Sequence, residues 1–364
     1  MRRLCLIKVA QPAQQGRSIN RDTVNEFFSP QVMKSFLHIT KLAVLYLVQL
    51  LVIVLVIGRI YEVIAEARDD KRLPPPGQLF EVDGHLMHIH CQGQDSPTIV
   101  VEQDNGAQSL GWSEVNENMS RLSRTCAYDR AGMGYSEPAS RTPTAGDIAQ
   151  DLQKLLQAAD ITDDLVLVGW SAGGIYQREF YRQFPDRVKG MVLVDSAHEQ
   201  QTKRMPPQGA AESINPAKIY QYLAPFGGLR LSGRVEQQFA DSTFSAPIRD
   251  RLIAVNLKSH MYRTLAAESE AFDAELAQLR TPPSLDGLPL VVISEGKPDT
   301  PYMQENLELW NGLQEELKNL STNSKHVVAE NSPHAIHRYQ PELIVESVAE
   351  VVNAARTGAR IQPR

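Results

Sequence analysis

The segment Gly169 to Gly173, which reads GWSAG, places a serine between two glycines in a setting typical of catalytic nucleophiles. The apolar run 165–168 before it is predicted to be a strand, and the stretch 175–184 after it has the character of a helix. A chain that turns sharply from strand to helix strains its backbone, and glycines, which have no Cβ, let the turn form. Ser171 is therefore expected to be an exposed nucleophile, and the chemistry that of a serine hydrolase.

A serine hydroxyl is a weak nucleophile until a base takes its proton, so a histidine must follow it in the fold. Of the nine histidines, His334 is placed best, because it lies in a loop after the last predicted strand, 325–330, and before the terminal helix. His337, three residues further on, is the alternative. In chain order the acid should lie between serine and histidine.

The acid that orients the histidine is expected at the carboxyl end of a strand, where functional groups collect in open α/β sheets. Asp299 follows the predicted strand 288–294 and is the first choice. Asp195, which ends the preceding strand, and Glu295 are the alternatives. A buried acid would hold the imidazole in the correct tautomer and stabilise its protonated form.

The oxyanion that develops during acyl transfer needs two backbone N–H donors. One is expected from Ala172, the residue after the nucleophile, and the other from Asn105 in the loop 102–107, which follows the third predicted strand. Asp104 in that loop is unexpected, since its negative charge would oppose the charge of the oxyanion unless the side chain points away.

Eight short apolar runs are predicted strands, and amphipathic helical stretches alternate with most of them. The runs are 78–82, 85–91, 98–102, 125–129, 165–168, 190–195, 288–294 and 325–330. Asp83 and Gly84 suit the positive φ angles of a tight hairpin turn between the first two. The alternation predicts an α/β fold, a mainly parallel sheet with helices on both faces. Residues 199–286 contain helix-like stretches and no convincing core strand, which predicts an inserted helical cap.

These residues, together with the segment 128–136 (YDRAGMGYS), resemble the α/β-hydrolase superfamily over nearly the whole of 78–364. The resemblance implies an eight-stranded sheet whose second and fourth strands are adjacent, and a cap over Ser171. That adjacency would bring Cys91 near Cys126, so either a disulfide or two free buried thiols is expected. The chain looks like membrane-anchored bacterial serine hydrolases of the esterase and lipase type, but Asp104 stands where the superfamily's oxyanion loop usually has glycine.

An N-terminal transmembrane helix is expected to precede this domain. Residues 42–58 carry no charge, and about 17 residues of helix span roughly 25 Å, the lower limit for crossing a bilayer. The expected organisation is a basic tail (1–41), an anchor (42–61), a proline-rich linker (62–77) and the hydrolase domain (78–364). Within the linker, the segment 73–77 is expected to be a stiff polyproline stretch that holds the domain away from the helix end. A cleaved signal peptide and a buried soluble helix are the alternatives.

The tail 1–41 holds seven basic and two acidic residues, which favours its retention in the cytoplasm and an extracytoplasmic catalytic domain. The formal net charge of the chain is −6, and an acidic body argues against nucleic acid as a partner. The expected function is hydrolysis of carboxylic esters or related acyl compounds through an acyl-serine intermediate, without a cofactor or metal. An amide hydrolase or aminopeptidase on the same triad and a non-catalytic sensor of small ligands are the alternatives.

Overall fold

The computed structural model describes residues 30–207, 215–240, 242–276 and 284–362, and its centre is an eight-stranded sheet. The order of the strands across the sheet is β1-β2-β4-β3-β5-β6-β7-β8, as an α/β-hydrolase fold requires. β1 and β2 form an antiparallel hairpin, β2 pairs antiparallel with β4, and the remaining pairs are parallel. The strands are β1 (Gln78–Val82), β2 (His85–Gln92), β3 (Thr98–Glu102), β4 (Thr125–Tyr128), β5 (Leu165–Trp170), β6 (Val188–Val194), β7 (Leu290–Glu295) and β8 (Ser324–Ala329).

The predicted strands are confirmed to within two residues at most ends, because apolar runs buried on both faces are a strong signal. The hairpin between β1 and β2 turns at Asp83 and Gly84, whose φ angles are 48° and 85°. Positive φ at both central residues is the conformation that matches the twist of the flanking strands.

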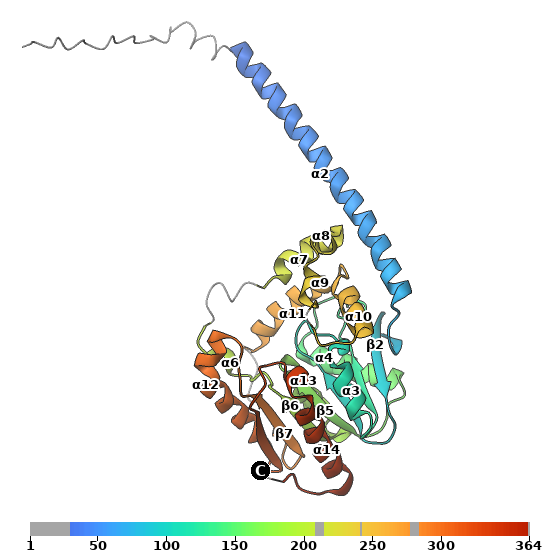
Figure 1. Cartoon of the computed structure of the whole chain (residues 1–364), viewed down its shortest axis with the longest axis vertical. Helices are drawn as coiled ribbons and strands as arrows, with labels where there is room; N and C mark the ends of the chain where they lie inside the picture. The colour runs from blue at the N-terminus through green and yellow to red at the C-terminus, as the bar shows by residue number, and fades with distance from the viewer. Residues whose placement is uncertain (1–29, 208–214, 241, 277–283, 363–364) are drawn as a thin grey trace, which may run out of the picture. The chain divides into compact units, whose positions relative to one another are not determined.

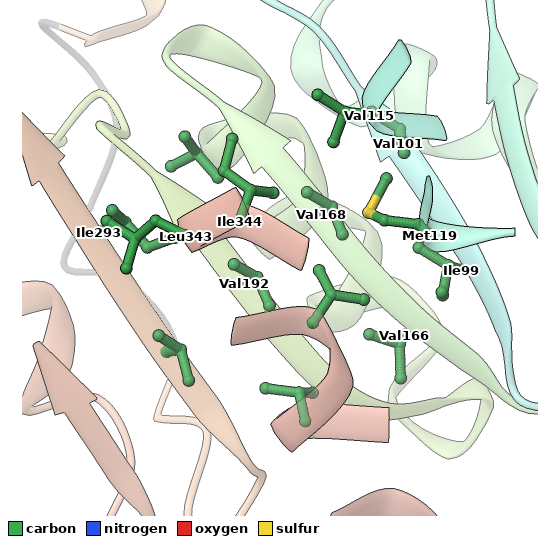
Figure 2. Close-up of a cluster of buried hydrophobic side chains, with 14 of the residues drawn as sticks. Ile99, Val101, Val115, Met119, Val166, Val168, Val192, Ile293, Leu343 and Ile344 are labelled. Atoms are coloured by element: carbon green, nitrogen blue, oxygen red, sulfur yellow. The ribbon is translucent and has the colours of Figure 1, made fainter. Parts of the chain in front are cut away.

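Helices cover both faces of the sheet (Figure 1). Alternate side chains of the central strands belong to two separate cores, one on each face. On one face α3 (Ser113–Met119) and α14 (Pro341–Thr357) pack on Ile99, Val101 and their neighbours, as Figure 2 shows. On the other face α4 (Ala145–Ala158), α5 (Ala172–Gln183) and α12 (Pro301–Lys318) pack on Val100, Leu167 and their neighbours. The loops at the carboxyl ends of the parallel strands therefore stand on a core that is packed on both faces of the sheet.

The segment between β6 and β7 is helical where the structure describes it, which confirms the expected cap. Its elements are α6 (Gln201–Arg204), α7 (Ala217–Leu223), the 3-10 turn η3 (Ala224–Phe226), α8 (Gly228–Ser232), α9 (Arg234–Gln238), α10 (Ala246–Asn256) and α11 (Met261–Leu276). A separate small core, which includes Leu229, Val235, Met261 and Tyr262, joins these helices to Met133 of the main domain. The cap is thus a packed part of the domain.

The N-terminal helix α2 (Pro30–Arg72) is apolar enough to cross a membrane and is exposed throughout its most apolar stretch, unlike a core helix. The chain divides into two units, 1–57 and 58–364, so the end of α2 from Gly58 belongs with the hydrolase domain. Residues 1–29 of the basic tail, including Cys5, lie outside the described residues.

The expected boundaries at the end of this helix were wrong. Residues 62–72, assigned to the linker, continue the helix and contact the cap. The reason is electrostatic: Arg230 of α8 donates to Glu62 at 3.0 Å and to Asp69 at 2.7 Å, and Lys258 lies 3.2 Å from Asp70. Only residues 73–77 remain as a short connection to β1.

Cys91 of β2 and Cys126 of β4 form a disulfide, one of the two outcomes that the sequence left open. The two residues lie directly opposite each other in the antiparallel pair. The bridge therefore ties the outer hairpin to the parallel part of the sheet.

Candidate active site

Ser171 lies at a strained turn between β5 and α5, as expected for a nucleophile elbow. Its backbone has φ 55° and ψ −123°, a conformation that a residue with a side chain adopts only when its surroundings enforce it. A Cβ at Gly169 would lie 2.7 Å from the carbonyl oxygen of Gly173, and a Cβ at Gly173 would lie 2.5 Å from that of Glu102. Both glycines are therefore required for the helix to start so close to the strand ends.

His334 lies in the loop after β8, where its ring is paired with Asp195. The distance from Nδ1 of His334 to Oδ2 of Asp195 is 2.5 Å. The histidine side chain is 40% exposed, whereas the carboxylate is completely buried. The carbonyl of His334 accepts a hydrogen bond from the indole of Trp170, the residue before the nucleophile, so the histidine loop is fixed beside the elbow.

Asp195 is held in a fixed orientation by its own donors. Its Oδ1 accepts hydrogen bonds from the backbone N–H of Glu295 at 2.9 Å and from the indole of Trp310 at 2.8 Å. Its φ of 44° turns the chain sharply at the end of β6. The role of Trp310 in this arrangement has no signal in the sequence, since α12 can be predicted as a helix but not which of its residues faces Asp195.

The structure does not support Asp299, the first choice for the acid. The carboxylate that contacts His334 belongs to Asp195, which was named as an alternative. Asp299 lies exposed near the end of the loop between β7 and α12. Both positions follow neighbouring strands, β7 and β6, so strand order alone could not decide between them. The histidine loop bends toward β6, which is also the strand next to the nucleophile strand β5.

Glu295, the other alternative, is buried beside this pair. Burial, together with the charge of Asp195, raises the pKa of Glu295 to about 7. It is thus about half protonated near pH 7, and the imidazole of His334 is hydrogen-bonded to Asp195.

The charged surroundings of His334 favour its protonated form. Burial alone would lower the pKa of His334, but the hydrogen bond and charge of Asp195, with Asp104 and Glu295 nearby, raise it to about 9. A carboxylate at this position stabilises the imidazolium that forms when the histidine takes a proton.

His337, the alternative base, is part of the core. Its ring stacks on Trp112 with centroids 4.7 Å apart and meets the edge of Trp170 at 4.4 Å. Burial lowers its pKa to about 3, so it stays neutral. Its position supports packing of the histidine loop and leaves His334 as the titrating group beside the elbow.

The expected oxyanion site is occupied by a side chain of the protein itself. The backbone N–H of Ala172 donates to Oδ1 of Asp104 at 3.3 Å, so the Asp104 carboxylate points into the place where an oxyanion would be. The side chain of Asn105 accepts a hydrogen bond from the hydroxyl of Tyr176 at 2.8 Å, which fixes this residue over the start of α5.

A buried arginine braces the oxyanion loop from behind. Arg130 donates to the carbonyl oxygens of Gln103 and Asp104 at 2.9 and 3.0 Å, and it pairs with Glu102 at 2.7 Å. Its other edge forms a two-pronged pair with Glu268 of the cap helix α11, at 3.1 Å for both contacts. Burial raises the pKa of Glu102 to about 7 in spite of this arginine. No sequence pattern predicts that Glu268 pairs with Arg130, because the two residues are 138 positions apart.

A cavity of about 880 Å³ opens beside His334, between α6 and the start of α12. Glu295, Asp299 and His334 lie on one part of its wall. Much of the remaining wall is apolar and includes Met205, Pro206, Pro207, Met303 and Trp310. A mainly apolar wall with a few polar groups at one place is typical of a site for a small organic ligand.

The family model described as alpha/beta hydrolase family matches residues 65–347, so the chain belongs to the α/β-hydrolase family. Among curated proteins, an uncharacterized protein of Schizosaccharomyces pombe is 25% identical over 78% of the chain, and YqjL of Bacillus subtilis is 24% identical over 76%. The matches cover 57% of the yeast protein and 92% of the bacterial one.

Among solved structures, the carboxylesterase CesB of Bacillus subtilis has a TM-score of 0.54 and 18% identity, covering 83% of this chain and 99% of that one. A thermophilic esterase from Thermogutta terrifontis has a TM-score of 0.53 and 18% identity, covering 77% and 99%. At these identities the likeness shows the fold. Together with the family it supports a hydrolase.

Proposed function

We propose that the protein is a membrane-anchored serine hydrolase that cleaves carboxylic esters or related acyl compounds through an acyl-Ser171 intermediate. The observation that carries the proposal is the combination of a strained elbow at Ser171 with a His334–Asp195 pair held beside it by Trp170. The esterases with the same fold support the ester class of substrate.

In the proposed reaction the Oγ of Ser171 attacks the ester carbonyl while Nε2 of His334 takes the hydroxyl proton. Asp195 keeps Nδ1 of the ring protonated and stabilises the imidazolium. The tetrahedral oxyanion accepts hydrogen bonds from the backbone N–H groups of Ala172 and Asn105, which requires the Asp104 carboxylate to move away. His334 then protonates the departing alcohol, and a water molecule releases the acid in the reverse sequence of steps.

The cavity beside His334 is the proposed acyl pocket, because Met205, Met303 and Trp310 give it an apolar wall. Three aromatic residues of the cap lie elsewhere: Tyr222 and Phe226 are exposed, and Phe272 packs on Tyr176.

The test is labelling of the full chain with a fluorophosphonate, which forms a covalent bond to an activated serine and releases fluoride. We expect labelling of the natural protein, none of Ser171→Ala, and strongly reduced labelling of His334→Ala and Asp195→Asn. Asp299→Asn tests the alternative acid and should still be labelled, and Asp186→Asn, an exposed carboxylate outside the cavity, is the control. A folded natural protein that neither labels nor hydrolyses any of a panel of esters would contradict the proposal.

A second candidate function is a non-catalytic sensor of small ligands, and one observation favours it. The Asp104 carboxylate already accepts the N–H of Ala172, so the protein as it stands has no free pair of oxyanion donors at this place. A sensor would bind an ester analogue with the same affinity before and after Ser171→Ala and would not consume it.

For topology, we propose that the hydrolase domain lies outside the cytoplasm. The basic tail favours the cytoplasmic side, and the Cys91–Cys126 disulfide suits an oxidising compartment. In intact cells that make the full chain, a membrane-impermeant maleimide should label Cys5 only after permeabilisation. Labelling of Cys5 in intact cells would show that the tail lies outside and the hydrolase domain lies in the cytoplasm.

A further inference from the structure

The cap carries a cluster of exposed apolar side chains that the site and its chemistry do not use. Ile219, Tyr222, Leu223 and Phe226 recur at the spacing i, i+3, i+4, i+7 along α7 and η3, so they share one side of this segment. Together with Leu231 of α8 they form what we call the cap apolar face. Their exposed fractions are 56%, 71%, 45%, 37% and 74% respectively. An apolar helical face of this kind usually packs into a protein core, but here it is exposed at the surface.

The backbone at Phe226 and Gly227, next to the cap apolar face, packs on α2 from Gly58, the last residue of the uncharged segment 42–58. A Cβ at Gly58 would lie 2.6 Å from the carbonyl oxygen of Phe226, and a Cβ at Gly227 would lie 2.8 Å from the ring of Tyr61. The cap is therefore in backbone contact with the helix where the charge-free stretch ends.

This placement is fixed by charged contacts further along the helix. Arg230 pairs with Glu62, which is only 1% exposed, and with Asp69. Glu66 accepts the backbone N–H of Ser259. From Gly58 to Asp69 the helix rises about 16 Å. Phe226 meets the helix at its membrane end, and the ion pairs lie on the side away from that end.

The apolar surface continues from the cap onto the helix. Ile60, Tyr61, Val63 and Ile64 are 42–55% exposed at the same level as Phe226. Arg59, next to Ile60, and Arg234, three residues after Leu231, are exposed cations close to this surface in the chain. An apolar face edged by basic residues is the pattern of segments that lie in a membrane interface, where the cations reach the lipid phosphates.

We propose that the cap apolar face inserts into the surface of the same bilayer that α2 crosses, so that the domain touches the membrane at two places. We take lipid to be what covers the face. The cap contacts α2 where the uncharged segment ends, so the face lies at the depth of the bilayer surface. The proposal does not depend on the chemistry of Ser171, since a sensor with the same cap would dock in the same way.

The test uses the full chain with Cys5→Ser, reconstituted into liposomes of phosphatidylcholine and phosphatidylglycerol. An environment-sensitive fluorophore is attached at Leu231→Cys or, in a separate sample, at Tyr222→Cys. The matched control is Ala359→Cys, an exposed position directly after α14. Figure 1 shows α7 and α8 at one end of the domain and the C-terminus at the other. Lipids with a spin label near the top of the acyl chain serve as quenchers.

We expect blue-shifted emission and at least twofold quenching at positions 231 and 222, and no quenching at 359. Adding Ile219→Ser and Leu223→Ser should reduce the quenching at 231 by half or more, whereas Gln238→Ser on α9 should not. Equal quenching at 231, 222 and 359 would overturn the proposal. So would a blue shift that grows with the protein-to-lipid ratio without quenching by labelled lipid, because a second copy of the chain would then cover the face.

Discussion

The carboxylate of Asp104 accepts a hydrogen bond at 3.3 Å from the backbone N–H of Ala172, the group expected to stabilise an oxyanion at Ser171. Asp104 is held close by Arg130, which binds its carbonyl oxygen, so this contact belongs to a braced loop. A negative charge at this place raises the energy of a developing oxyanion.

Replacing Asp104 by asparagine or glycine should therefore raise the rate of acyl transfer. Loss of one oxyanion donor typically costs about 10²–10³ in kcat, and freeing Ala172 should recover a part of this, about tenfold or more. The measurement is kcat for a chromogenic ester, or the rate of fluorophosphonate labelling. Asp186→Asn, an exposed carboxylate after α5, is the control. A rate unchanged or lowered in both Asp104 variants would mean that the carboxylate does not block the site.

The pKa of His334, raised to about 9 because Asp195 outweighs the effect of burial, predicts an alkaline activity profile. The base must be neutral to accept a proton, so kcat/KM should rise with pH until about pH 9 and then level off. Asp195→Asn should move this inflection to lower pH and reduce kcat by about 10⁴-fold. Asp299→Asn should change neither. An inflection near pH 6 in the natural protein would contradict the charged environment described here.

His88 and Asp129 form a buried ion pair that supports the loop after β4, and breaking it should destabilise the domain. Nδ1 of His88 lies 2.8 Å from Asp129, and Nε2 donates to the carbonyl of Pro76 at 2.6 Å, so both nitrogens face acceptors. His88→Gln should lower the free energy of unfolding by about 3–5 kcal/mol, because it leaves a buried carboxylate unpaired. His90→Gln, on the same strand and half-buried, should cost much less.

The pH dependence of this loss follows from the sign of the shift. Burial alone would lower the pKa of His88, but Asp129 and the Pro76 carbonyl raise it above its ordinary value. The stabilisation is therefore complete below the ordinary histidine pKa and fades as the pH rises through the raised value. Denaturant titrations should show the largest difference between natural protein and His88→Gln near pH 6, and a smaller one at alkaline pH. A difference that grows with pH would show that the neutral histidine is the stabilising form.

The Cys91–Cys126 disulfide links residues 35 positions apart and should contribute about 2–4 kcal/mol to the free energy of unfolding. Reduction, or Cys91→Ala with Cys126→Ala, should lower the denaturation midpoint by a corresponding amount. Cys5→Ala removes the chain's other cysteine and is the matched control. Two thiols that react with a maleimide in the unreduced, unfolded domain would show that the bridge is absent.

Much of the fold could be predicted from the sequence because its signals are local. Eight apolar runs correspond to the eight strands, the pair Asp83 and Gly84 makes the hairpin turn, and the strand-free segment becomes the cap. The positions of Ser171 and His334 likewise follow from which strand each of them follows. Each of these features depends on a short stretch of chain and on the few ways in which parallel strands and helices can be joined.

Pairings between distant segments were decided only by the tertiary structure. Asp195 follows β6 and Asp299 follows β7, and these two strands are neighbours in the sheet. The direction of the histidine loop decides that Asp195 is the partner of His334. Glu62 and Asp69 appear in the sequence as polar residues after a membrane span, and their partner Arg230 lies more than 160 positions away. Hydrophobic periodicity fixes which face of an element is buried, but a hydrogen bond depends on the position of a single side chain, and that position is set by the packing of the whole domain.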